Sequence, residues 1–198
     1  MVKNDIITDI KKELRSCMNG VASAAMRQTE DYRVNFGVEL PRLHELSKAF
    51  EPDHQLAQTL WKERVRECRI LATILMPAAD FDEELCDIWV EDIHTAEMAQ
   101  IFALNLMRRL PYASEKAFEW IASEIPMRQV VGYYTMCHVL RKGEMNERSA
   151  EELLDQLACD IHSEVQALQT AAVKTLQNFA LQSENNAPKA KKMSDYLL

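Results

Sequence analysis

Two pairs of neighbouring cations, Arg108-Arg109 and Arg141-Lys142, are the side chains in this sequence best placed to bind a charged ligand. Each pair closes a stretch whose apolar residues recur three and four apart, which is the spacing of a helix face. Arg128 lies between them. In stacked structural repeats, equivalent positions line up on one side, so the pairs would form a basic stripe that binds phosphates. The alternative is ordinary helix chemistry, because cations stabilise the partly negative C-terminus of any helix.

No other group of residues has the spacing of a catalytic or metal site. The sequence contains no Gly-rich phosphate loop, no G-x-S-x-G and no H-E-x-x-H. None of the five histidines is followed by a second His or Cys three or four residues later, and the five cysteines include no C-x-x-C. We therefore expect no metal and no cofactor, and we interpret the cysteines as buried reduced thiols.

The charge is distributed unevenly along the chain. The net charge of −8 argues against broad, non-specific binding of nucleic acid, which depends on cations that neutralise phosphates. Eight carboxylates and no Lys or Arg lie between Asp80 and Glu97, whereas six basic and three acidic residues lie between Met98 and Lys142. A local basic face is therefore compatible with an acidic protein.

The elements that would position these cations are helices. Only four glycines and six prolines interrupt the chain, and its 47% apolar content is enough for a substantial core. Trp61, Trp89 and Trp120 fall on apolar helix faces and are interpreted as core residues. We predict helices at about 3–18, 21–31, 40–50, 53–62, 64–76, 81–92, 95–109, 114–124, 127–141, 146–161 and 164–183.

The residues that stop these helices recur regularly. Pro41, Pro77, Pro111 and Gly143 are 36, 34 and 32 residues apart. The residues before two of these stops also resemble each other at an offset of 31, since Ile70, Ala72, Leu75 and Met76 match Ile101, Ala103, Leu106 and Met107. A helix-pair period of this length predicts an all-α fold of the HEAT-like or armadillo-like α-α superhelix type, built from stacked antiparallel helix pairs. A generic helical bundle is the alternative.

We expect one HEAT-like domain over residues 1–184, followed by a C-terminal tail over 185–198. The tail contains a lysine cluster and is either mobile or docked through Tyr196-Leu197-Leu198. The N-terminus lacks the apolar core of a signal peptide, and no apolar stretch approaches the ~20 residues that span a bilayer. The sequence therefore predicts a cytoplasmic protein with no membrane partner.

Two motifs resemble those of a known family. The segment Asn35-Phe36-Gly37-Val38-Glu39-Leu40-Pro41-Arg42-Leu43, and Leu60-Trp61 followed by Arg66-Glu67-Cys68-Arg69-Ile70-Leu71-Ala72, resemble motifs of the DNA alkylation repair family of AlkD-like HEAT-repeat glycosylases. The resemblance implies a helical solenoid that holds duplex DNA on a concave face and excises N3- and N7-alkylated purines. In such enzymes an Asp stabilises the positive charge that builds on the sugar, and two Trp rings contact the cationic base.

The sequence departs from the family pattern at those catalytic positions. By the resemblance, Ala96 stands in place of the first Trp and Gln100 in place of the catalytic Asp, so Glu97 is the nearest candidate carboxylate. Lys174 stands in place of the second Trp, and Arg128 is kept as a candidate phosphate contact.

Two functions follow from the sequence. The first is a DNA alkylation repair-like protein that binds duplex DNA on a concave helical-repeat face, with weak excision of alkylated purines. Its candidate DNA contacts are Arg108, Arg109, Arg128, Arg141, Lys142 and Lys174. The second is a non-enzymatic helical-repeat module that binds a protein or a nucleic acid in its groove.

Overall fold

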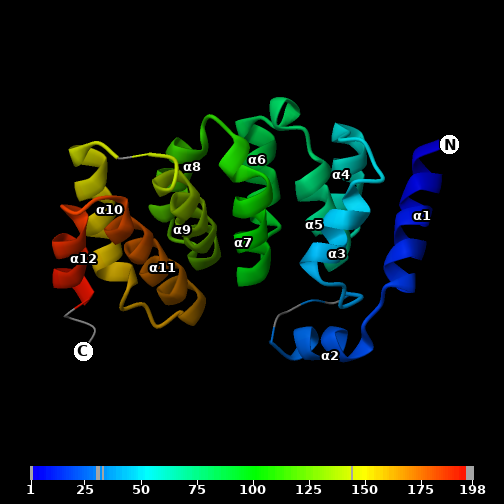
Figure 1. The fold of residues 1–198 in the computed structure, drawn as a ribbon, viewed down its shortest axis with the longest axis horizontal. Helices are drawn as coiled ribbons and strands as arrows, with labels where there is room; N and C mark the ends of the chain where they lie inside the picture. The colour runs from blue at the N-terminus through cyan, green and yellow to red at the C-terminus, as the bar shows by residue number, and fades with distance from the viewer. Residues whose placement is uncertain (1, 30–31, 33, 144, 195–198) are drawn as a thin grey trace. The chain divides into compact units, whose positions relative to one another are not determined.

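The computed structural model describes residues 2–29, 32, 34–143 and 145–194, and most of these residues are helical (Figure 1). The helices of this part are α1 (Val2–Ser16), α2 (Gly20–Thr29), α3 (Leu40–Ser47), α4 (His54–Lys62), α5 (Arg66–Leu75), η1 (Ala78–Asp80), α6 (Glu83–Glu91), α7 (Ala96–Asn105), η2 (Met107–Arg109), α8 (Ala113–Ile121), α9 (Pro126–Leu140), α10 (Glu147–Asp160), α11 (Gln166–Gln182) and α12 (Asn186–Ser194). The β-type pairing within these residues is a single parallel bridge between Val34 and Val65. The all-α prediction is therefore confirmed.

Every helix predicted from the apolar spacing is present to within a few residues, with one interruption. The helix predicted over 95–109 breaks after Asn105, where Leu106 adopts φ −115° and the chain continues as the 3-10 turn η2. The stretch Val130–Thr135, which has the composition of a strand, lies inside α9 and is buried there. Burial explains its uniformly apolar pattern, because a helix packed on several sides has no polar face.

The segment expected to be a C-terminal tail contains α12, which packs against α11. Pro188 falls in the first turn of this helix, where the missing N–H costs no hydrogen bond. The predicted docking of Tyr196, Leu197 and Leu198 lies outside the described residues. The single domain predicted over 1–184 stays a prediction.

The chain groups into two compact units, residues 1–86 and residues 87–198. In the C-terminal unit, α9 packs against α7, α8 and α11, and α10 packs against α11. Short connections join α8 to α9 and α10 to α11, which is the organisation of stacked helix pairs. The second helices of the successive pairs, α5, α7, α9 and α11, begin 30, 30 and 40 residues apart. The predicted offset of 31 thus corresponds to the step from α5 to α7.

The same turn is built twice, 40 residues apart, at the starts of α9 and α11. In each, a serine hydroxyl accepts a hydrogen bond from the backbone N–H two residues later, and a glutamine amide donates to a carbonyl at the end of the preceding helix. These residues are Ser123 and Gln129 in the first turn, and Ser163 and Gln169 in the second. The repeat predicted from helix stops is therefore also present in the hydrogen bonding.

Close packing fixes α8 against α9. A Cβ at Gly132 would approach the Ile121 side chain and backbone N to 2.9 Å and the Ala117 carbonyl oxygen to 3.0 Å. The rings of Trp120 and Tyr133 are fully buried beside this approach. Gly132 therefore lets the two helices come together at a distance that no larger residue permits.

In the N-terminal unit, a buried ion pair holds the loop that precedes α3. Glu67 accepts hydrogen bonds from the backbone N–H groups of Phe36 (3.0 Å) and Val38 (3.2 Å). Arg66 donates to Glu67 (3.1 Å) and to the carbonyl oxygen of Val38 (2.9 Å). Gly37, between the two anchored residues, has φ +69°. The motifs that carry the family resemblance in this region thus fold one onto the other.

Within the described residues, no helix is long and apolar enough to cross a membrane. The five cysteines are free thiols, and three of them, Cys68, Cys86 and Cys137, are buried. The interpretation of the cysteines as buried thiols agrees with these three, whereas Cys17 is half-buried and Cys159 is exposed.

Candidate nucleic-acid interface

Three of the four cations in the predicted pairs, Arg108, Arg141 and Lys142, act electrostatically on His138, on the last turn of α9. Burial, together with the positive charges of Arg141, Arg108 and Lys142, lowers the pKa of His138 to about 4. Arg108 belongs to η2, just after α7, so the C-terminal ends of α7 and α9 lie within electrostatic reach of each other. We call Arg108, Arg141 and Lys142, with the neutral His138 between them, the basic cluster.

The cations of the basic cluster are exposed, and no carboxylate of the described residues forms an ion pair with them. Other cations of the chain are paired. Lys11 is bound to Glu63, and Lys116 lies 2.8 Å from both Asp87 and Glu119. In a protein with a net charge of −8, three exposed cations without a carboxylate partner among the described residues favour an approaching anion.

One guanidinium of the cluster is held in place. Arg141 donates from Nε to the side-chain oxygen of Asn178 on α11 (2.9 Å), and Asn178 in turn donates to the carbonyl oxygen of Lys174 (2.8 Å). Among the described residues, none accepts a hydrogen bond from the terminal nitrogens of Arg141. A guanidinium fixed along one edge presents its other edge in a defined direction, which suits a phosphate.

Beside this arginine the surface is hollowed. A pocket of about 420 Å³ lies between the end of α9 and the last turns of α11. Its lining residues include Leu140, Arg141, Lys142, Asn178, Leu181 and Gln182. The pocket therefore combines two cations with apolar surface.

Lys174 and Arg109 extend the positive charge. Lys174 lies over the ring of Tyr134, with Nζ 5.7 Å from the ring centroid, and its charge acts on Cys137 together with that of Arg141. The guanidinium of Arg109 is partly desolvated although the side chain is exposed, and this desolvation and the charge of Arg108 lower its pKa. These two cations adjoin the basic cluster.

The remaining candidate cation is elsewhere. Arg128 lies in the first turn of α9, 13 residues before Arg141, so the two are roughly 20 Å apart along the helix axis. Its guanidinium is 3.5 Å from the carboxylate of Glu91. The structure therefore brings together most of the predicted cations but places Arg128 at the other end of the helix.

The positions predicted for catalysis lie at the start of α7. Thr95 caps this helix by accepting from the N–H of Met98 (3.2 Å), and Glu97 and Gln100 follow in the first two turns. Gln100 is exposed and Glu97 half-buried. Gln100 lies in α7 and Arg108 eight residues later in η2, so the predicted catalytic positions belong to a different element from the cations of the basic cluster.

A family model described as "DNA alkylation repair enzyme" matches residues 10–196. The chain belongs to this family. Among solved structures, the chain is similar to one described as "A new family of proteins related to the HEAT-like repeat DNA glycosylases with affinity for branched DNA structures". The TM-score is 0.87 and the identity 17%, over 95% of this chain and 81% of the other. This likeness confirms the HEAT-like fold. A comparison with curated proteins gave no match.

In this member of the DNA alkylation repair family, the tryptophans are core residues. Trp89 and Trp120 are fully buried, and the indole N–H of Trp120 donates to Asp87 (3.1 Å). Trp61 is 2% exposed and lies under the guanidinium of Arg69 in the N-terminal unit. All three rings are thus buried, which agrees with their interpretation from the sequence as core residues.

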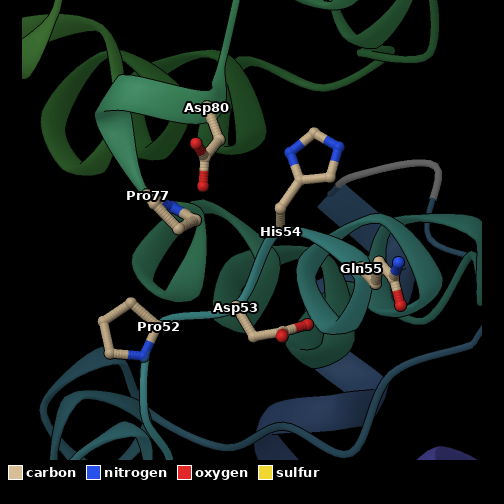
Figure 2. Close-up of a pocket in the computed structure, with 6 residues that line it drawn as sticks. All are labelled: Pro52, Asp53, His54, Gln55, Pro77 and Asp80. Carbon is tan, nitrogen blue, oxygen red and sulfur yellow. The ribbon is translucent and has the colours of Figure 1, made fainter.

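A second pocket, in the N-terminal unit, has the opposite character (Figure 2). It has a volume of about 540 Å³ and is lined by Pro52, Asp53, His54, Gln55, Pro77 and Asp80. The carboxylate of Asp53 is engaged as the cap of α4, accepting from the N–H of Leu56 (2.7 Å). With two carboxylates and no Lys or Arg among these residues, this pocket repels phosphate. No group of three or more potential metal ligands occurs among the described residues.

Sequence reasoning missed two residues of the interface. His138 lies three and four residues before Arg141 and Lys142, so helical spacing already places it on their side. Asn178 is 37 residues from Arg141, and nothing in the local sequence signals their contact.

Proposed function

We propose that this DNA alkylation repair family protein binds duplex DNA through the basic cluster of its C-terminal unit. The observation that carries the proposal is the gathering of Arg108, Arg141 and Lys142 around one histidine without a carboxylate partner among the described residues. Exposed cations in that arrangement attract phosphates and discriminate poorly between base sequences. Such a role agrees with the cytoplasmic location expected from the sequence.

The test is the salt dependence of binding to a labelled duplex, measured by fluorescence anisotropy. Three or four phosphate contacts give a slope of log K against log salt of about −2.7 to −3.6, so that affinity falls roughly 40- to 150-fold between 50 and 200 mM salt. The double variant Arg108→Ala/Arg141→Ala should reduce the slope by about 2, equally for unrelated sequences. The control Lys12→Ala/Arg15→Ala removes the same charge from exposed positions of α1. An equal loss in both variants would mean that net charge, and not the cluster, governs binding.

Branched DNA belongs in the same assay, because the similar solved protein comes from a family described as having affinity for it. A four-way junction and a duplex of the same total length should be compared under identical salt. Binding of either form that depends on the basic cluster supports the proposal.

We propose further that excision of N3- and N7-alkylated purines is weak. A preorganised charge at the reacting centre is worth about a hundred- to a thousandfold in rate, and Gln100 carries no charge. Glu97 lies one turn before Gln100 on the same helix face and is the carboxylate that would supply any residual activity. Release of 7-methylguanine from methylated duplex should be compared for wild type, Glu97→Gln and Gln100→Asp. Fast wild-type release that is unaffected by Glu97→Gln would place the catalytic group elsewhere.

The second candidate is a module that binds a protein partner. It is favoured by the acidic stretch from Asp80 to Glu97, which has no Lys or Arg. That surface would suit a basic partner. Failure of every DNA form to bind at 50 mM salt would favour this alternative.

A further inference from the structure

We propose that the pocket between the end of α9 and α11 binds one unpaired nucleotide of a DNA strand, with its phosphate on Arg141 and Lys142 and its base against Leu140 and Leu181. This inference rests on the proposed function, because it assumes that DNA lies on the basic cluster. It goes further by assigning a second, distinct contact that only an unpaired strand can make.

The first argument is the chemistry of the pocket lining. Leu181 is 86% exposed, and it lines the pocket together with two exposed cations. Leu140, at 4% exposure, supplies further apolar surface in the same pocket. A nucleotide has this combination of an anionic phosphate and a flat base with apolar faces. The volume of about 420 Å³ is in the range of small-ligand sites.

The second argument is the state of the two amides in the pocket. Asn178 donates to Lys174 and accepts from Arg141, so both its polar atoms are engaged. Gln182 donates to the carbonyl oxygens of Leu140 and Gly143 and accepts from Asn186. These amides hold the end of α9 and the guanidinium in place, so protein contacts fix their orientation. With its phosphate on two cations and its base face against leucines, the nucleotide is recognised with little regard to base identity.

The third argument separates paired from unpaired DNA. In a duplex the faces of the bases are stacked on one another, so Leu181 has nothing apolar to contact. An unpaired nucleotide exposes its base face and can turn it toward the protein. Leu181 therefore contributes only when the DNA contains an unpaired segment, whereas Arg141 contributes in both cases.

The experiment compares three labelled DNAs at fixed salt. The first is a blunt duplex, the second is the same duplex with a gap that leaves five dT nucleotides unpaired, and the third has the same gap with five unpaired dC nucleotides. Wild type should bind both gapped forms more tightly than the blunt duplex, and alike. Leu181→Ser should weaken binding of the gapped forms roughly three- to tenfold, the effect of partly burying one leucine, and leave blunt duplex unchanged. Arg141→Ala should weaken all three. Because Leu181 is exposed, its replacement leaves the core intact, which circular dichroism will verify.

The matched control is Val21→Ser, which replaces another apolar side chain, 83% exposed, in the N-terminal unit. It should change none of the three affinities. Equal wild-type binding of blunt and gapped DNA, with the basic cluster still required, would overturn the pocket assignment and leave the proposed function standing. If wild type binds none of the three DNAs, both the pocket assignment and the proposed function are overturned. Displacement of gapped DNA by an acidic, leucine-containing peptide in wild type but not in Leu181→Ser would assign the pocket to a protein instead.

Discussion

Arg66 in the N-terminal unit and two arginines of the C-terminal unit, Arg108 and Arg141, lie in opposite environments. In the N-terminal unit, Arg66 and Glu67 are 2% and 0% exposed, are bonded to each other, and are bonded to the backbone of one loop. In the C-terminal unit, Arg108 and Arg141 are exposed, and none of the described carboxylates pairs with them. A buried charge must be satisfied within the fold, whereas an exposed one is available to a ligand. The same residue type is thus a structural element in one unit and, by our proposal, a binding group in the other.

The comparison predicts its largest effect at the buried pair. Glu67→Ala should lower the free energy of unfolding by about 3–5 kcal/mol, because it leaves Arg66 buried without its counter-charge and frees two backbone N–H groups. Thermal or denaturant unfolding followed by circular dichroism measures this loss. The control Glu45→Ala removes an exposed partner of Arg42 and should cost about 0–1 kcal/mol. Similar losses of stability in the two variants would show that the buried pair of Arg66 and Glu67 does not stabilise the fold.

This contrast was only partly visible in the sequence. Helical periodicity and the proline and glycine stops were enough for the eleven predicted helices, because apolar spacing is set locally by which face is buried. The helix α12 escaped prediction because its apolar content is low and one buried alanine, Ala190, holds it against the rest of the unit. The cation pairs were found because they close successive helices.

The environment of those cations could not be predicted, because it depends on contacts distant in sequence. The separation of Arg128 from the basic cluster follows from helix length and from its proximity to Glu91, 37 residues away. The hold of Asn178 on Arg141 and the pocket beside Leu181 arise where α9 and α11 pack, which no local pattern encodes.

The second prediction concerns pH and the basic cluster. His138 has a folded pKa of about 4, below the value of about 6.5 for an unfolded histidine, so the unfolded chain binds more protons between these values. Its contribution to stability is therefore present above pH 6.5 and is lost as the pH falls toward 4. His138→Gln should lessen the decline of the free energy of unfolding over that range by about 1–3 kcal/mol. Identical pH profiles of variant and wild type would contradict the assigned environment.

A duplex bound to the basic cluster should alter this pH dependence. Phosphates beside Arg108, Arg141 and Lys142 offset the positive charges that disfavour a protonated His138, so binding raises its pKa. Affinity for duplex should then increase as the pH falls from 7 to 5, and more in wild type than in His138→Gln. An equal increase in both would assign the proton to another group.

The third prediction tests how Arg141 is positioned. Asn178→Ala removes the acceptor for its Nε and should weaken duplex binding about fivefold, equivalent to roughly 1 kcal/mol, by releasing the guanidinium from a fixed orientation. The slope of affinity against salt should stay nearly the same, because the charge itself remains. In an Arg141→Ala background, Asn178→Ala should have no further effect. If Asn178→Ala still weakens duplex binding about fivefold in that background, Asn178 contacts the DNA directly.

The smallest effect is expected on the stability of the C-terminal unit, and its sign is the informative part. Arg108, Arg141 and Lys142 carry like charges that all act on His138, so any two of them that lie close together repel each other. Arg108→Ala removes one of the like charges and should leave the free energy of unfolding unchanged or raise it by up to about 0.5 kcal/mol. Added salt screens exposed charges, so any gain should shrink between 20 and 200 mM salt, over which the Debye length falls to less than about 10 Å. The same substitution weakens binding to duplex, so stability and affinity change in opposite directions.

At the buried pair of the N-terminal unit, by contrast, removing a charge lowers stability at every salt concentration. A destabilisation of 1 kcal/mol or more in Arg108→Ala would show that this arginine, like Arg66, belongs to the fold and not to the ligand.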